Sequence, residues 1–517
     1  MVVYEDTNWQ ADRRKNLPHL AILIVAALLL GLYLIFTTVL IAKDGVLYVE
    51  RARNFANNPI GIIKGDPPAG YSFLIFAAHK FVTLSGGGTS VPMNRDWILS
   101  AQCVTLLCRL LAIIPLYFIG RILVGSEKSF WAVLILIMLP YPAEFGSDVL
   151  RDWPHIMFLA WGLLFLILGI KSGKWWMFAV AGFIAGFGQM VRSECAQIVI
   201  YGVLWLIIGL FLPRPNISRL KILCLMLAIL IGFAIPAAPY FRLRGEILPP
   251  QLKRLISYDT PLQSSRSEQA GFSCNAVVCT ASAASTSADI LKALINLAGG
   301  ISSNMMYFFV VPLVIGFCEQ YRRIRKVLLT EWFFIYALLT LYLVIMVLLN
   351  VNYGYISKRH SMPMVVFAVF YIPVGLQILA SWLNRRTFKS GSAAEENMRL
   401  WFFILMAVGF GICAAKFARM TPLRWEKQGY RNAAEWLNKN TAPADIIAVP
   451  DFRVTFYAER CYGVAVKSNG DYAADVKYAV HIVKGQGDLK ENAPSGMSEI
   501  WSSSNKDGTK MLIYGRK

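Results

Sequence analysis

The sequence predicts an α-helical membrane protein that ends in a small α/β domain. The first observation behind this fold class is the composition, because 56% of the 517 residues are hydrophobic and only 16% are charged. Soluble domains carry about 25% charged residues. The second is the length of the uncharged runs: Leu20 to Ala42 contains no charge and is long enough to cross a hydrocarbon core roughly 30 Å thick. Backbone polar groups inside lipid must pair within their own segment, so such runs must be helices.

The apolar runs predict about eleven transmembrane helices. They lie near 20–42, 98–120, 129–145, 154–170, 175–191, 196–212, 222–240, 300–318, 327–349, 361–383 and 400–417. The apolar stretch 71–84 is too short to cross and includes His79 and Lys80. We therefore expect it to lie along the interface.

The distribution of basic residues predicts a cytoplasmic N-terminus. Arg13, Arg14 and Lys15 precede the first span, and with an odd number of spans every short loop on that side is basic, as cytoplasmic loops are. The predicted domains are a cytoplasmic tail over 1–19, a transmembrane domain over 20–417 and an extracytoplasmic domain over 418–517. The outer loops are expected over 43–97, 141–153 and 241–289.

The C-terminal segment is not membrane-like. Tyr430–Asn438 reads as a helix with an apolar side, and Asp445–Val449 and Met511–Tyr514 read as strands. About 100 residues suffice for a small α/β domain, and no catalytic motif stands out in it. The net charge of +20 is explained largely by the inside loops, so nucleic acid is not an expected partner.

The cysteines predict no metal site, because no zinc-type Cys or Cys/His spacing occurs. Cys274 and Cys279 lie in a polar outer loop. They are equally well interpreted as a disulfide, if that side is oxidising, and as two free thiols.

Charged residues at the predicted outer membrane edge are the candidates for chemistry. Asp44 follows the first span directly, and Tyr48 comes one helical turn later. Asp66 precedes Pro67-Pro68 and Tyr71, where the prolines favour an extended entry into the next segment. A helix cap or an interfacial charge explains any single one of these acids equally well.

A second set lies in the other outer loops. Asp148, Arg151 and Asp152 follow the spacing i, i+3, i+4, so we expect one helix face to carry all three. Arg192, Lys358 and Arg359 are cations on the outside, against the inside-positive trend. They are explained by an anionic ligand such as a lipid phosphate, or by pairing with the acids.

The order of these features resembles the GT-C membrane glycosyltransferases that use polyprenyl-phosphate sugars. Their relatives include the aminoarabinose transferases of lipid A and the protein O-mannosyltransferases of glycosyltransferase family 39. The pattern covers most of residues 20–460 and consists of Asp44 and Tyr48, Pro67-Pro68 with Tyr71, Ala101-Gln102, Gly120-Arg121-Ile122-Leu123, Asp148 with Arg151-Asp152, Gly182, Gly186, Gly188 with Arg192, Arg359 with Pro363, and the helix Arg431–Leu437. The position before Pro-Pro is often His or Lys in such proteins and is Asp66 here, and no Asp-x-Asp motif occurs.

The resemblance implies a GT-C fold and sugar transfer from a polyprenyl-phosphate-linked donor to a lipid, glycan or protein acceptor. It implies a multi-pass protein of the bacterial inner membrane, with the active site and C-terminal domain facing the periplasm or exterior. Asp44 is the expected general base, and Asp148 is expected to orient the acceptor or a cation. The expected substrate-binding residues are Tyr48, Asp66, Tyr71, Arg151, Asp152, Arg192, Lys358 and Arg359. No metal or cofactor is expected.

Two other functional classes fit a polytopic protein. A lipid or glycan transporter or flippase would usually contain internal repeats and broken polar helices near the bilayer midplane, and no repeat is evident. A structural or assembly subunit would tolerate loss of Asp44.

Overall fold

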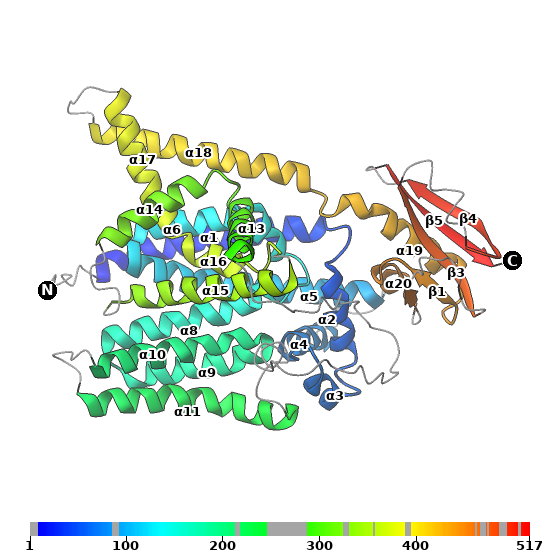
Figure 1. Ribbon diagram of the computed structural model, residues 1–517, viewed down its shortest axis with the longest axis horizontal. Helices are drawn as coiled ribbons and strands as arrows, with labels where there is room; N and C mark the ends of the chain where they lie inside the picture. Colours follow the sequence, from blue (N-terminus) through cyan, green and yellow to red (C-terminus); the bar gives the residue numbers. More distant parts are fainter. Residues whose placement is uncertain are drawn as a thin grey trace.

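The computed structural model is a helical bundle with a small α/β unit at one end (Figure 1). It describes residues 9–84, 93–211, 218–245, 287–323, 330–354, 357–387, 394–460, 463–465, 472, 475–484, 494–504 and 508–516. The loop around Cys274 and Cys279, and Cys461, lie outside the described residues.

The first half of the chain forms the helices α1 (Trp9–Phe36), α2 (Lys43–Arg53), α3 (Pro59–Lys64), α4 (Gly70–Leu84), α5 (Met93–Val124), α6 (Ser126–Met138), α7 (Pro140–Phe145), α8 (Asp152–Ser172), α9 (Trp175–Val191), η1 (Ser193–Ala196), α10 (Gln197–Phe211) and α11 (Arg219–Arg244). The second half of the bundle consists of α13 (Ser287–Asn304), α14 (Val310–Arg323), α15 (Trp332–Tyr353), α16 (Met362–Ala368), α17 (Tyr371–Thr387) and α18 (Ala394–Met420).

Seven of the described helices are long and apolar enough to cross a membrane, or eight if the bent pair of α16 and α17 is one span. Eight is three fewer than the eleven expected, because two predicted spans are broken and a third has only 17 residues. Residues 129–145 divide into α6 and α7 at Leu139, where the following Pro140 disfavours helix. Residues 300–318 divide between α13 and α14, with Met306 and Tyr307 at positive φ. Residues 175–191 form α9, which has only 17 residues.

The first span also ends earlier than the sequence predicts. The uncharged run continues to Ala42, but α1 ends at Phe36, and residues 37–42 form an irregular connection to α2. Asp44 therefore lies in the first turn of a separate helix rather than directly at the end of a span.

α9 and α11 pack with their backbones in contact. A Cβ atom added to Gly182 would lie 2.1 Å from the carbonyl oxygen of Ile229, and one added to Gly232 would lie 2.1 Å from that of Ala179. Small residues permit this approach between membrane helices, where dispersion forces replace the hydrophobic effect. The glycine-rich span of the sequence thus belongs to a helix–helix interface that fixes the end of α9.

The C-terminal unit is the α/β fold that the sequence predicts. It contains η3 (Trp425–Lys427), α19 (Gln428–Asn440), β1 (Ile446–Val449), α20 (Arg453–Tyr457), β2 (Gly463–Ala465), β3 (Val476–Lys484), β4 (Met497–Ser504) and β5 (Thr509–Arg516). The strand order is β2-β1-β3-β5-β4, in which β1 is parallel to β2 and β3 and the other pairs are antiparallel. Buried Ala433 and Leu437 of α19 pack on Ile447 and Ile513 of the sheet. The predicted helix and both predicted strands are confirmed.

Candidate active site

Four of the selected charged residues are joined by ion pairs, and α2, which carries one of them, lies at the end of the bundle next to the C-terminal unit (Figure 1). Asp44 lies in the first turn of α2, and Asp152 is the first residue of α8. Arg192 directly follows α9, and Arg359 lies in the turn before α16. Four chain segments that are distant in sequence therefore contribute to one site.

These side chains and Glu194 form a continuous series of ion pairs, which we call the ion-pair chain. Arg359 joins two carboxylates, since its Nη1 donates to Asp44 Oδ2 at 2.8 Å and its Nε to Asp152 Oδ2 at 3.0 Å. Arg192 donates from Nη1 to Asp152 Oδ1 at 2.9 Å and from Nε to Glu194 Oε1 at 2.9 Å. Such charge-assisted hydrogen bonds are shorter and stronger than neutral ones, so each guanidinium has a fixed orientation.

From Asp152 to Asp44 the exposure of the side chains in the ion-pair chain increases, which distinguishes these two carboxylates. The Asp152 side chain is 4% exposed and lies between two guanidinium groups, which occupy both of its oxygens. The Asp44 side chain is 53% exposed, and among the described residues only Arg359 pairs with it, through one oxygen. Asp152 is thus a buried counter-ion for two arginines, whereas the second oxygen of Asp44 has no hydrogen-bond partner among the described residues.

Arg151 is a cation beside the ion-pair chain, and no carboxylate within the described part of the protein pairs with it. Its guanidinium lies 6.0 Å from the ring centroid of Tyr48, a cation–π distance. Tyr48 packs edge-on against Tyr71, whose hydroxyl is 2.7 Å from Thr105 Oγ1. Burial raises the pKa of Tyr48. Both tyrosines are buried, and Arg151 lies against this aromatic pair through Tyr48.

Asp148 does not share a helix face with Arg151 and Asp152, because α8 begins only at Asp152. Its side chain is fully buried. Its Oδ1 accepts hydrogen bonds from the backbone N–H groups of Ala42 at 3.0 Å and of Val149 at 2.7 Å, and its Oδ2 accepts one from Arg424 at 2.5 Å. The expectation of one helix face was wrong because the chain turns between residues 146 and 151.

Asp66 lies at a neighbouring corner of the bundle. Its carboxylate pairs with Arg244 at the end of α11 at 3.0 Å. The loop around it is held by Arg51, whose guanidinium donates to the carbonyl oxygens of Ile62 at 2.6 Å and Pro67 at 2.8 Å. No ion pair among the described residues joins Asp66 to the ion-pair chain.

The Lys358 side chain has a different partner from that of its neighbour Arg359. Its ammonium lies 3.9 Å from the ring centroid of Tyr141 on α7, and Lys416 of α18 approaches the same ring to 5.5 Å. The Lys358 carbonyl oxygen accepts hydrogen bonds from Asn304 and Ser361, which fix the turn. This residue therefore holds the turn that presents Arg359 and adds positive charge beside it.

No sequence pattern indicated Arg424, which lies in the connection between α18 and α19. Its guanidinium donates to Asp148, to Glu144 Oε1 at 3.1 Å and to the carbonyl oxygen of Leu40 at 2.8 Å. No periodic pattern surrounds it, so only the tertiary structure reveals its role. Across the described residues no three His, Cys, Asp or Glu side chains are grouped so that they could hold a metal ion.

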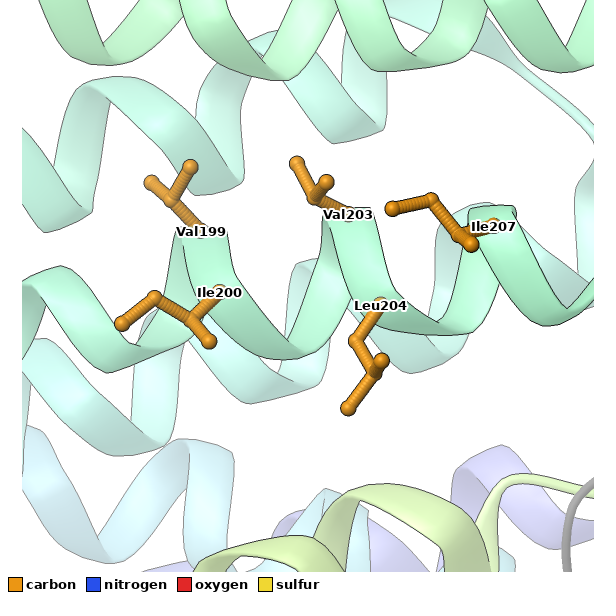
Figure 2. Close-up of a pocket in the computed structure, with 5 residues that line it drawn as sticks. All are labelled: Val199, Ile200, Val203, Leu204 and Ile207. Atoms are coloured by element: carbon orange, nitrogen blue, oxygen red, sulfur yellow. The ribbon is translucent and has the colours of Figure 1, made fainter.

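An apolar pocket of about 330 Å³ lies along α10, which directly follows the turn that carries Glu194. Figure 2 shows its lining residues, which are all aliphatic and project from successive turns of this helix: Val199, Ile200, Val203, Leu204 and Ile207. Ile200 and Leu204 are exposed, so the pocket is open to the apolar surroundings of the bundle. A hydrocarbon chain suits such a lining.

One protein-family model matches part of the chain. It is that of the dolichyl-phosphate-mannose-protein mannosyltransferases, and it matches residues 86–238. The matched part contains Asp148, Arg151, Asp152 and Arg192. No curated protein matches the chain in sequence.

Solved structures match nearly the whole chain. ArnT from Cupriavidus metallidurans bound to undecaprenyl phosphate is 12% identical, with a TM-score of 0.58, and the match covers 96% of this chain and 97% of ArnT. The apo oligosaccharyltransferase from Archaeoglobus fulgidus is 13% identical, with a TM-score of 0.52, and the match covers 96% of this chain and 74% of that protein. At such low identity the likeness concerns the fold.

The family match and the fold agree with the resemblance that the sequence predicts. The fold is shared from end to end with ArnT, and the family match falls on the part that carries most of the buried charges of the site. The chain therefore has the GT-C fold of ArnT over nearly its whole length, and over residues 86–238 it is similar to the dolichyl-phosphate-mannose-protein mannosyltransferases.

Proposed function

We propose that this protein transfers a sugar from a polyprenyl-phosphate donor to an acceptor hydroxyl, with Asp44 as the general base. The observation that carries the proposal is the position of Asp44 at the exposed end of the ion-pair chain. It is a carboxylate open to solvent and held beside a guanidinium that can meet a phosphate. A base and an anion-stabilising cation are the two groups that this reaction needs.

The reaction has a simple balance. The acceptor oxygen forms a bond to the anomeric carbon while the bond from that carbon to the donor phosphate oxygen breaks. The acceptor proton passes to Asp44, and the polyprenyl phosphate leaves with the bonding electrons. Attack opposite the leaving group inverts the anomeric centre.

Arg359 and Arg151 are the residues that we assign to the leaving phosphate. Arg359 is held in place by the buried Asp152, and Arg151 has no acidic partner among the described residues. Preorganised cations stabilise negative charge that develops in a water-poor site without having to reorient. Arg192 has an indirect role, because it holds Asp152 in place and Asp152 in turn holds Arg359.

The remaining expected site residues have supporting roles in this proposal. Both oxygens of Asp148 are already occupied by hydrogen bonds from within the protein, which favours a positioning role over contact with the acceptor. Tyr48 contacts Arg151 through its ring, and Tyr71 packs against Tyr48. Asp66 and Lys358 flank the site, and we assign them to substrate binding rather than to proton transfer.

The donor lipid has a suitable surface on the bundle. The aliphatic pocket on α10 (Figure 2) begins close to the ion-pair chain, since α10 follows η1 and Glu194. A phosphate at Arg359 and an isoprenoid tail in the bilayer beside α10 are therefore compatible. The acceptor is a lipid, a glycan or a protein hydroxyl.

We also propose that the site and the C-terminal domain face the periplasm or exterior of a bacterial inner membrane. The basic loops assigned to the cytoplasm support this orientation. It retains the count of about eleven membrane segments if the shorter and broken helices of the bundle also cross. An odd number leaves the N-terminus and the C-terminal domain on opposite sides.

Asp44→Asn tests the proposed base. This substitution keeps the size of the side chain and removes its basicity. General-base assistance contributes roughly 10²–10⁴ in rate, so we expect kcat to fall by that factor. The measurement is sugar transfer from a polyprenyl-phosphate donor by the purified protein, with monodisperse elution in detergent as the check on folding.

Asp66→Asn is the matched comparison. Its side chain is 54% exposed and paired with a single arginine, much as Asp44 is 53% exposed and paired with Arg359. We expect it to change KM and to leave kcat within about threefold, well short of the loss expected for a general base. Equal loss of kcat in both variants, or normal turnover in Asp44→Asn, would exclude Asp44 as the base. A folded wild-type protein that moves lipid-linked sugar without transferring it would instead support a transporter.

A further inference from the structure

The connection between α1 and α2 has backbone groups whose hydrogen-bond partners lie outside the helical bundle. Residues 37–42 are irregular, so their backbone groups have few partners within their own segment. Leu40, Ile41 and Ala42 are nonetheless buried. Buried backbone N–H and C=O groups need partners, and the hydrogen-bond partners of the Val39, Leu40 and Ile41 backbone come from the C-terminal part of the chain.

The partners begin directly after α18. The backbone of Leu423 donates to the Thr37 carbonyl oxygen at 3.1 Å, and the Leu423 carbonyl oxygen accepts from the Val39 N–H at 3.1 Å. Arg424 then donates to the Leu40 carbonyl oxygen at 2.8 Å. The connection is thus paired in strand-like fashion with residues that lead into the C-terminal unit.

Helix α20 supplies the next partners. The Ile41 N–H donates to the Tyr457 hydroxyl at 3.1 Å, and the Ile41 carbonyl oxygen accepts from Arg453 Nη1 at 3.2 Å. The Ala42 N–H donates to Asp148, which Arg424 holds from its other side. The backbone immediately before α2 is therefore held by Tyr457 and Arg453 of α20. It is also held by Asp148, which Arg424 fixes in turn.

These partners are themselves held rigidly. Asp451 accepts hydrogen bonds from Arg453 Nε at 3.0 Å and Nη2 at 2.7 Å, so the guanidinium is oriented before it meets Ile41. Arg424 has a φ of +59°, a left-handed conformation that is costly for a residue with a side chain. It is maintained while the guanidinium bridges Glu144, Asp148 and Leu40.

Asp44 is two residues beyond this anchored backbone. The Ala42 carbonyl oxygen accepts the hydrogen bond from the Gly45 N–H at 2.9 Å that opens α2. A shift of residues 41 and 42 therefore moves Asp44 relative to Arg359. A displacement of about 1 Å in a reacting group costs on the order of 100-fold in rate.

We propose that the C-terminal domain is a working part of the active site, in which Arg424, Arg453 and Tyr457 are positioning residues that fix the backbone on which Asp44 is mounted. The proposal rests on the proposed role of Asp44. It assigns a function in turnover to a domain in which the sequence shows no catalytic motif, and it requires no contact between that domain and the substrate.

Tyr457→Phe in the full-length protein is the primary test, with hydrogen–deuterium exchange and kinetics as parallel readouts. The variant removes only the hydroxyl that accepts from the Ile41 N–H. We expect at least tenfold faster exchange in a peptide covering residues 37–44. We expect kcat to fall about tenfold with the KM for the donor nearly unchanged. Arg453→Lys, which keeps the charge and loses the bidentate hold on Asp451, should act in the same direction.

Arg460→Lys is the matched control. Arg460 also uses its guanidinium to hold backbone, but its partners are Leu437, Asn438 and Thr441, all within the C-terminal unit. It should leave both the exchange of residues 37–44 and kcat at the wild-type values. If Arg460→Lys lowers kcat as much as Tyr457→Phe does, the domain acts through stability alone and the proposal fails.

A double variant separates this proposal from that of the general base. Combined with Asp44→Asn, Tyr457→Phe should lower kcat little further. An asparagine at position 44 cannot act as a base, so its displacement no longer affects the rate. Independent, multiplicative losses would overturn the positioning role. Unchanged hydrogen exchange of residues 37–44 in Tyr457→Phe would overturn the positioning role, whatever the activity of Asp44→Asn. If Asp44→Asn is active and exchange in Tyr457→Phe is fast, only the assignment of Asp44 as the base is refuted.

Discussion

Three aspartates within one site have three different environments, and the environment divides their roles. Asp44 is 53% exposed with one arginine partner, Asp152 is 4% exposed between two arginines, and Asp148 is fully buried among backbone N–H groups and Arg424. A carboxylate that is fully paired inside the protein holds its neighbours in place. Only one with an accessible oxygen can take a proton from a ligand.

Glu50, on the same helix as Asp44, predicts a pH dependence of stability. Burial raises the pKa of Glu50 to about 7, against the smaller opposing effect of Arg53. A folded-state pKa above the unfolded value of 4.5 means that its contribution to stability is complete below pH 4.5 and is lost as pH rises through 7. Glu50→Gln should therefore stabilise the protein at pH 8, by on the order of 3 kcal/mol, and change little at pH 4.5.

The measurement is the thermal midpoint of the detergent-solubilised protein at both pH values. Glu435→Gln is the control, because this carboxylate on α19 is 57% exposed and should give the same small change at each pH. A Glu50→Gln protein whose midpoint relative to wild type does not rise between pH 4.5 and pH 8 would refute the assignment.

Charges next to apolar runs are conspicuous in a sequence, and so Asp44, Asp152, Arg192 and Arg359 could all be selected from it. Which of them pair could not be predicted, because ion pairs between α2, α8 and the turn before α16 depend on tertiary structure. Arg424 could not be selected from the sequence, because its partners Asp148 and Glu144 also depend on the tertiary structure. The roles assigned to the selected residues remain predictions.

At the scale of elements, the contact between α9 and α11 sets the position of Arg192. A Cβ atom at Gly182 would lie 2.1 Å from a backbone carbonyl oxygen of α11, and no rotamer change can relieve a clash with backbone. We expect Gly182→Ala to separate the helices, lower the thermal midpoint by several degrees and reduce transfer, because overpacking costs about 1–3 kcal/mol.

Gly411→Ala is the matched control for this prediction. It lies within α18, and a Cβ atom there would meet nothing within 4 Å. Alanine has a higher helix propensity than glycine, so this variant should be as stable as wild type or more so. Equal behaviour of the two variants in thermal unfolding would contradict the packing argument.

The elements that the sequence predicted well are long and uninterrupted, such as the spans that became α5, α8 and α11. The errors fall where local chemistry interrupts an apolar run. Pro140 divides one predicted span, and Met306 and Tyr307 divide another. The end of α1 at Phe36 could not be predicted, because residues 37–42 continue the uncharged run but pair with the distant segment 423–457.

At the scale of the whole molecule, the beginning of α1 and the C-terminal sheet lie at opposite ends (Figure 1). We therefore predict that a cysteine introduced at Lys439 on α19 reacts with a membrane-impermeant maleimide in intact cells. One introduced at Arg385, near the end of α17, should react only after permeabilisation. Both positions are exposed, so a difference in labelling reports the side of the membrane.

Mass spectrometry of the labelled peptides distinguishes the introduced thiols from the native cysteines. Labelling of Lys439→Cys only after permeabilisation would reverse the orientation. It would place the site on the cytoplasmic side and exclude an acceptor outside the cell.

The position of Arg359 between two carboxylates has a consequence for charge balance during turnover. When Asp44 takes the acceptor proton it becomes neutral, and its ion pair with Arg359 weakens. At that moment the departing phosphate gains a negative charge near the same guanidinium. In the proposed reaction one cation thus changes partner from carboxylate to phosphate, and the local net charge stays constant throughout the bond exchange. Asp152 keeps the guanidinium in place while this happens, so the exchange requires the movement of a proton and electrons but not of the side chain.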